Sequence, residues 1–282
     1  MGQPRPAGRR PKIGLALGGG FARGLAHIGV LRVFEEEGIP IHAIAGVSAG
    51  AMAAAAFASG ASSYDIERVA GCMKFSDVAR WTISRLGLAG SERMSVFLRR
   101  LLKVYRFEEM KIPLAVVATG LETARPVVFR DLGDVIIPIR ASCSYPGLFQ
   151  PVRHEGHYLV DGAMTMELPA QPLREMGCTH VVSVYLPMAG SYSPGNMLGV
   201  VNRCFQIMQS RSEWQWRRHS SVVIEPDVRG NAWDSFIDCQ LMIESGRQAA
   251  LAAIPKIKRL LGSPREAERE SMKGMALNPE LP

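Results

Sequence analysis

Two short apolar runs near the start of the chain are each followed at once by a helical pattern. Residues 12–17 (KIGLAL) and 41–46 (IHAIAG) read as buried strands. Residues 23–38 place apolar side chains every three or four positions, and residues 49–60 form a second helical stretch made mostly of alanine. Strand, helix, strand and helix within about fifty residues predict a right-handed βαβ unit and a parallel sheet.

The rest of the chain continues this alternation. Strands are predicted at residues 112–119, 126–130, 157–163, 179–186 and 220–227, and helices at 62–110, 133–144, 196–218 and 236–261. The 282 residues show no internal repeat and no linker, so one α/β domain over residues 12–262 is expected. A disordered basic tail at 1–11 and a polar tail at 263–282 are expected to flank it.

Ser48 lies at the second strand-to-helix junction, within the pentapeptide GVSAG at residues 46–50. A Gly-x-Ser-x-Gly turn between a strand and a helix exposes the serine hydroxyl beside a helix N-terminus, which stabilises developing negative charge. Gly46 and Gly50 let the flanking backbone pass closely. The pattern therefore favours a nucleophilic serine over a structural turn.

The first junction is the glycine loop GGGFARG at residues 18–24. A dinucleotide-binding loop would need an acidic residue at the end of the next strand, and a P-loop would need Gly-Lys-Ser/Thr, and neither is found. The loop instead predicts an oxyanion hole, in which the backbone N–H groups of Gly18, Gly19 and Gly20 face a tetrahedral intermediate beside Ser48.

The serine needs a base, and the residues alone leave alternatives open. Asp161 ends an apolar strand and precedes Gly162 in a turn, at the carboxyl edge of the sheet, where partial desolvation would raise its pKa toward that of a useful base. A second interpretation is an α/β-hydrolase triad of Ser48, Asp161 and His180, although none of the six histidines has a context that singles it out. A third is a catalytically idle protein that binds lipid or a nucleotide, or acts as a regulator.

Charge and composition narrow the partners. The formal charge of +7 favours anionic surfaces. Residues 94–110 read as a basic amphipathic helix that either lies on a membrane or docks on the core with a solvated basic face. The low-charge run 43–61 consists mostly of Ala, Gly and Ser, which favours a packed strand and helix over a membrane span. We expect peripheral contact with an anionic membrane and no nucleic-acid partner.

Cysteine usage and the N-terminus bear on location and cofactors. The five cysteines are scattered and form no C-x-x-C pair, which argues against disulfides and zinc and fits a reducing cytosol. No apolar run follows the basic, proline-rich start, so a secretory signal is not expected. We therefore expect a cytoplasmic protein, in part at the inner membrane face, that needs no metal and no cofactor.

Four motifs in this order, GGGFARG, GVSAG, RASCSYPGLFQPV and LVDGA, resemble the bacterial members of the patatin-like phospholipase family, with similar spacing from about Lys12 to Leu261. The resemblance implies a three-layer α/β/α fold with a mostly parallel central sheet and hydrolysis of lipid acyl esters by a Ser–Asp dyad without histidine. It assigns Ser48 as nucleophile, Asp161 as base and residues 18–20 as the oxyanion hole. Arg23 and Gly24 complete the glycine motif, and Pro146 matches the family's proline segment.

Two features remain open under this resemblance. Many members of the family carry a further glycine where this chain has Phe21, whose ring restricts the loop and could face the acyl channel. The apolar side chains within residues 197–216 could form a lid over an acyl groove or pack in the core: Met197, Leu198, Phe205, Met208, Trp214 and Trp216. The lipid, the ester position and the oligomeric state are not given by the sequence.

Overall fold

The computed structural model describes residues 11–71, 73–82, 84–187, 195, 197–228 and 238–262. The two predicted tails, residues 1–11 and 263–282, lie outside this part of the chain except for Pro11. Within the described ranges, no helix combines the length and the apolar character that crossing a bilayer requires.

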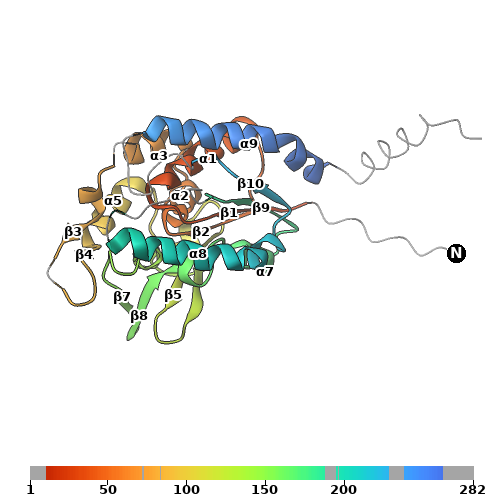
Figure 1. Ribbon diagram of the computed structural model, residues 1–282. Helices are drawn as coiled ribbons and strands as arrows, with labels where there is room; N and C mark the ends of the chain where they lie inside the picture. The colour runs from red at the N-terminus through yellow and green to blue at the C-terminus, as the bar shows by residue number, and fades with distance from the viewer. Residues whose placement is uncertain are drawn as a thin grey trace, which may run out of the picture.

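One sheet forms the centre of the molecule, with helices on both faces (Figure 1). Its strands follow the order β10-β9-β1-β2-β5-β8-β7, and β6 pairs with β5. Neighbours from β10 to β5 are parallel, whereas β6, β7 and β8 pair antiparallel. The strands are β1 (Ile13–Leu17), β2 (Ala43–Val47), β5 (Leu114–Gly120), β6 (Arg125–Arg130), β7 (Val152–His154), β8 (His157–Asp161), β9 (His180–Val184) and β10 (Val222–Ile224). The predicted three-layer α/β/α fold with a mostly parallel sheet is confirmed.

The helices form two layers. In Figure 1, α1, α2, α3 and α9 lie on one side of the sheet and α7 and α8 on the other. The α-helices of the described residues are α1 (Ala26–Glu36), α2 (Ala49–Ala58), α3 (Ser63–Ala70), α4 (Phe75–Val78), α5 (Glu92–Leu101), α6 (Ile136–Ser142), α7 (Ala170–Glu175), α8 (Met197–Arg217) and α9 (Cys239–Leu261). Three short 3₁₀ turns, η1 (Phe21–Leu25), η2 (Phe107–Glu109) and η3 (Gly162–Met164), and a small hairpin, β3 (Arg80–Trp81) with β4 (Ala89–Gly90), complete the description.

Small residues decide how closely the helices pack. Eight of the ten residues of α2 are buried alanine or glycine, so the second part of the low-charge run 43–61 is a helix packed in the core, as the sequence favoured over a membrane span. Helices α1 and α9 pack against each other at Gly29 and Gly246, where a Cβ on either glycine would collide with the backbone of the other helix. The first and last parts of the chain are thereby joined on one face.

The middle of the chain differs from the prediction. The helix expected over residues 94–110 ends at Leu101, and its apolar residues Phe97 and Leu98 face the core. Its exposed side carries Arg99 and Arg100. Helix α5 is therefore a docked helix with a solvated basic face, which was one of the two interpretations of the sequence.

Strands β2 and β8 meet end to end on one edge of β5, and this meeting positions the site. Val47, the last residue of β2, pairs with Val117, and Asp161, the last residue of β8, pairs with Ala118. Strand β6 occupies the other edge of β5 throughout. Because β2 is parallel to β5 and β8 is antiparallel, their carboxyl ends converge at Val117 and Ala118, which brings Ser48 and Asp161 together.

Candidate active site

Ser48 occupies a strained turn between β2 and α2. Its φ of 54° and ψ of −125° lie in a region that non-glycine residues rarely adopt. The Ser48 N–H donates to Ser142 Oγ at 2.8 Å, and that hydroxyl donates to the Val117 carbonyl oxygen at 2.6 Å. These two hydrogen bonds connect the turn to α6 and β5. They fix Ser48 at the carboxyl end of β2.

The glycines of the motifs lie where other backbone comes too close for a side chain. A Cβ on Gly50 would collide with the carbonyl oxygens of Leu17 and Gly18, and one on Gly162 with the Val117 carbonyl. A Cβ on Gly46 would collide with the backbone of α2, and one on Gly24 with the Ala49 Cβ of the same helix. These four glycines therefore let the loops that carry the candidate groups approach one another.

Asp161 is almost fully buried, with 1% of its surface exposed. Its Oδ1 accepts a hydrogen bond from the Ala163 N–H at 2.9 Å. Burial raises the pKa of Asp161 to about 7, although the Ala163 N–H and the nearby Ser48 hydroxyl both act in the opposite direction. The carboxyl group can therefore gain and lose a proton near neutral pH.

The glycine loop lies beside Ser48. Gly18 donates its N–H to the Val184 carbonyl oxygen at 3.2 Å, so this amide is engaged in the sheet. Gly19 is packed against the Ser48 side chain and Gly20 against Leu186. Among the described residues no hydrogen-bond acceptor is found for the Gly19 and Gly20 amides, which leaves them as the candidate donors of the loop.

His27, on α1, contacts the glycine loop through the Gly18 carbonyl oxygen. Its Nε2 lies 2.8 Å from the Gly18 carbonyl oxygen, and the side chain is fully buried. Burial lowers the pKa of His27 to about 4, so the imidazole is neutral and donates the Nε2 proton to Gly18. No pattern in the sequence predicted this contact.

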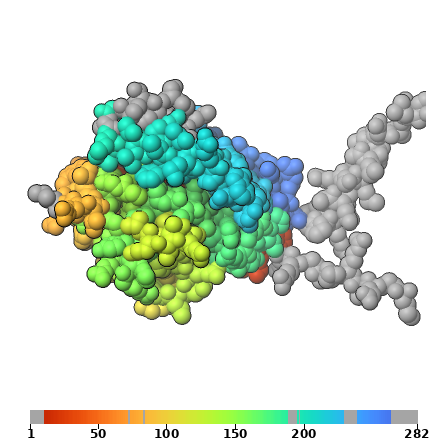
Figure 2. Space-filling view, turned by 60° about the horizontal axis from the view of Figure 1, so that its bottom comes forward, coloured from red at the N-terminus to blue at the C-terminus, as the bar shows by residue number. Residues whose placement is uncertain are grey.

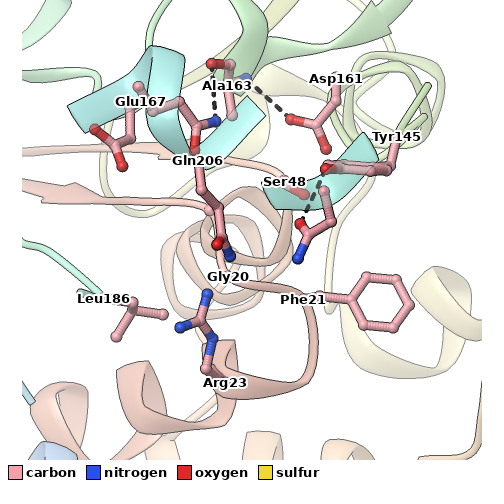
Figure 3. A pocket seen from close by; sticks show the side chains of 13 residues that line it. Gly20, Phe21, Arg23, Ser48, Tyr145, Asp161, Ala163, Glu167, Leu186 and Gln206 are labelled. Atoms are coloured by element: carbon pink, nitrogen blue, oxygen red, sulfur yellow. Dashed lines mark hydrogen bonds between the residues drawn. The ribbon is translucent and has the colours of Figure 1, made fainter. Parts of the chain in front are cut away.

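A polar cavity of about 620 Å³, counted with its open mouth, leads to Ser48 and Asp161 (Figure 3). In this view Glu167 and Asp161 lie on one side and Arg23 on the other. The Arg23 guanidinium is buried and donates from Nη1 to the Pro187 carbonyl at 2.9 Å. Burial raises the pKa of Glu167 to about 7, and the Trp216 indole N–H donates to its carboxyl group.

Helix α8 forms one wall of this cavity with three polar side chains, Asn202, Gln206 and Gln209. The Tyr145 hydroxyl donates to Asn202 Oδ1 at 3.0 Å, and Gln209 Nε2 donates to the Ala163 carbonyl at 3.2 Å. Of the apolar residues considered for a lid, Trp216 is buried, whereas Met197, Met208 and Trp214 are exposed on the outer side. Tyr145 comes from the segment that contains Pro146.

The Cys143 thiol also lies near Ser48 and Asp161. Burial, aided by the nearby Asp161 charge, raises the pKa of this thiol far above its usual range. Across the described part of the chain, no three His, Cys, Asp or Glu side chains gather closely enough to hold a metal ion.

His180 lies at the wrong end of the sheet for a triad. It pairs with Ile13 at the amino end of β1, whereas Ser48 follows the carboxyl end of β2. At about 3.3 Å per strand residue the two residues are more than roughly 15 Å apart. The geometry therefore does not support the alternative in which His180 serves Ser48.

The chain is similar to proteins of one known family. The family model described as patatin-like phospholipase matches residues 15–174. An uncharacterised NTE family protein of Mycobacterium tuberculosis (strain H37Rv) is 30% identical over 281 residues, which cover 89% of this chain and 47% of that protein. Lysophospholipase NTE1 of Cryptococcus neoformans is 34% identical over 198 residues, 65% of this chain and 12% of that protein. The chain thus spans about half the length, or less, of these curated relatives.

Solved structures share the fold at low sequence identity. VipD from Legionella pneumophila superposes with a TM-score of 0.59 at 13% identity, over 90% of this chain and 67% of VipD. ExoU of Pseudomonas aeruginosa, solved in complex with SpcU, gives a TM-score of 0.51 at 16% identity, over 90% and 54% of the two chains.

Proposed function

Because the chain belongs to the patatin-like phospholipase family, we propose that it hydrolyses acyl ester bonds of lipids, as a phospholipase A or lysophospholipase, through a Ser48–Asp161 dyad. The observation that carries this proposal is that the strained Ser48 and the buried Asp161 line the same cavity, and that burial brings the pKa of this carboxyl group to about 7. A carboxylate with that pKa is a far better base at neutral pH than a solvated aspartate.

In the proposed acylation step, Ser48 Oγ attacks the ester carbonyl carbon while its proton passes to the Asp161 carboxylate. The carbonyl oxygen becomes an oxyanion that the N–H groups of Gly19 and Gly20 stabilise, and Gly18 shapes the loop through its bond to Val184. The tetrahedral intermediate then collapses, the ester C–O bond breaks, and Asp161 gives the proton to the leaving alcohol or lysolipid.

Deacylation repeats these roles with water. Asp161 takes a proton from a water molecule as its oxygen adds to the acyl carbon. The second intermediate expels Ser48, which recovers the proton from Asp161, and the fatty acid leaves. No histidine takes part in this sequence, in keeping with the distance of His180 from Ser48.

The assay compares wild type, Ser48→Ala and Asp161→Asn on p-nitrophenyl esters and lysophospholipid, alongside labelling by a fluorophosphonate. We expect wild type to be labelled at Ser48 and active, and both variants to lose at least about a thousandfold in kcat. His180→Ala serves as the matched control and should keep near wild-type activity. If wild type is folded but neither active nor labelled, the hydrolase proposal is contradicted, and the result supports the alternative of a catalytically idle protein.

We further propose that an anionic bilayer is the surface on which the protein meets its lipid, and that the outer face of α8 is the contact. This face, a stripe along one side of the helix, presents Met197, Val200, Ile207, Met208 and Trp214 to solvent. Figure 2 shows α8 as a ridge along the surface. Arg217 of α8 is ion-paired with Glu213 and Glu225, whereas Arg211 is exposed on the same helix, and its positive charge complements anionic head groups.

A further inference from the structure

Two apolar cavities lie on the other side of Ser48 from the polar cavity. The first, the proximal cavity, measures about 350 Å³ counted with its opening to solvent and reaches Ser48 itself, with Cys143, Met94 and Phe149 among its walls. The second, the distal cavity, measures about 400 Å³ counted in the same way and extends between α2, α3 and α5, where Ala53, Ile66, Ala70 and Leu101 line it.

The two cavities are continuous in their lining. Phe21, Ala49, Met52 and Met73 border both of them. Their walls carry almost no polar atoms, in contrast to the polar cavity, which Arg23, Glu167 and the amides of α8 line. Apolar walls therefore extend from Ser48 into the helical layer formed by α2, α3 and α5.

Phe21 stands at the junction, because it borders the polar cavity and both apolar ones. Its φ of 51° is in the left-handed region, which costs backbone energy for a phenylalanine. Its ring packs against Phe75 with ring centres 6.4 Å apart, and Phe75 packs against Phe149 at 5.9 Å. The aromatic contacts hold the ring in place against that strain.

We propose that the proximal and distal cavities are the binding site for the acyl chain of the substrate, and that Phe21 divides this site from the polar cavity, which takes the alcohol or head-group side. The proposal rests on the hydrolase function proposed above. An ester carbonyl beside Ser48 then has its acyl chain directed past Phe21 toward Ala70 and its leaving group directed toward Arg23 and Gln206. Met52, Met73 and Met94 supply flexible walls that adapt to a mobile hydrocarbon chain.

The distal cavity sets the preference for long chains under this proposal. Each methylene group transferred from water into the cavities should raise kcat/KM by up to about fourfold, until the cavities are filled. Filling the distal cavity with protein should abolish that gain for long chains, because the reacting carbonyl lies at the opposite end.

The test uses p-nitrophenyl butyrate and p-nitrophenyl laurate below the concentrations at which they aggregate. Ala70→Phe on α3 and Ala53→Phe on α2 fill the distal cavity from opposite walls. Each should lower the ratio of kcat/KM for laurate to that for butyrate by at least about tenfold. Val69→Phe, at the neighbouring position of α3 that borders neither cavity, is the matched control and should leave the ratio unchanged.

Labelling of Ser48 by a fluorophosphonate tests the hydrolase function separately from the position of the acyl-chain site. If wild type and the variants are labelled and active, but both filled variants keep the wild-type chain-length ratio, the acyl chain lies elsewhere and this inference is overturned. The same holds if Val69→Phe lowers the ratio as much as Ala70→Phe. If wild type is neither labelled nor active, the proposed hydrolase function fails first.

Discussion

At the scale of single residues, Asp161 is the group whose protonation state controls the proposed reaction. Its burial raises its pKa to about 7, and only the ionised form can accept the Ser48 proton. We therefore expect kcat/KM to rise with pH along a one-proton curve with a midpoint near 7. Glu167 lies in the same cavity with a pKa of about 7 as well, so Glu167→Gln is the control, and the midpoint should survive it. A profile that is flat around neutral pH would exclude Asp161 as the base.

The same pKa has a consequence for stability. The folded pKa of about 7 exceeds the ordinary value of 3.8, so the folded state binds the proton more tightly, and this stabilisation is lost as the pH rises through 7. Asp161→Asn avoids the cost of a buried charge. At pH values above about 8 we expect urea denaturation to show the variant more stable than wild type by up to about 4 kcal/mol.

The difference should shrink as the pH falls toward about 4, where Asp161 is protonated in both states. Ser48→Ala provides the comparison, because it removes the partner hydroxyl and leaves the carboxyl group in place. If Asp161→Asn is less stable than wild type at alkaline pH, the charged Asp161 side chain stabilises the folded state, and this prediction is wrong.

His27 is a positioning residue for the glycine loop. Its neutral imidazole donates to Gly18, next to the amides proposed for the oxyanion hole. Since small displacements of such donors cost about a hundredfold in rate, His27→Ala should lower kcat by roughly that factor with little change in KM. His27→Gln, which can still donate, should recover part of the loss. An equal fall in both variants, or a change confined to KM, would contradict this role.

At the scale of helices and strands, local patterns predicted most of the elements that carry the motifs. The apolar runs ending before Ser48 and at Asp161 became β2 and β8, because strand propensity and burial act over a few residues. The hairpin β3–β4 was missed because two-residue strands carry no periodic signal. Helix α5 stopped at Leu101, nine residues before the predicted end, because the chain turns there to pack against neighbours that the sequence does not reveal.

The meeting of Ser48 with Asp161 depends on non-local pairing that no local pattern encodes. Strand β2 pairs with the first part of one edge of β5, and the antiparallel β8 pairs with the rest of that edge. This register is visible only in the folded sheet. The strand-end context singled out each residue by itself, and the family resemblance then implied that the two act as a pair. Cys143 and His27 were not predicted as part of the site, whereas the spacing of Asn202, Gln206 and Gln209 on α8 is a polar stripe that a helical reading could have found.

Helix α8 is the element on which the membrane proposal depends. Replacing Met208 and Trp214 by Glu together should reduce binding to vesicles that contain phosphatidylglycerol by at least about tenfold, because two apolar anchors are lost and two negative charges added. Co-sedimentation measures this binding, and hydrolysis of soluble butyrate reports folding. Wild-type binding should also weaken as salt is added.

Val96→Glu is the control for this experiment, since Val96 is similarly exposed but lies on α5. Equal losses in Val96→Glu and the double variant would assign the effect to overall charge instead of α8. If wild type does not bind the vesicles and is a dimer, while the double variant is a monomer, the outer face of α8 is a contact between copies of the chain.

At the scale of the whole molecule, the candidate site has two sides. Ser48 stands between a polar cavity walled by α8 and an apolar pair of cavities walled by α2, α3 and α5, and the glycine loop with Phe21 separates them. That division suits a lipid ester, whose reacting carbon joins a hydrocarbon chain to a polar remainder. The family resemblance predicted the three layers of the fold, yet the division itself arises only from packing among helices distant in the chain.

The central claim is that Ser48 becomes acylated with Asp161 as its base. Acid quenching shortly after mixing with p-nitrophenyl laurate, followed by intact-protein and peptide mass spectrometry, measures this directly. The account predicts a laurate adduct on Ser48 in wild type, forming faster as the pH rises through about 7, and almost none in Asp161→Asn on the same time scale. Turnover of the ester without an adduct on Ser48, or an adduct that forms equally fast in Asp161→Asn, would contradict it.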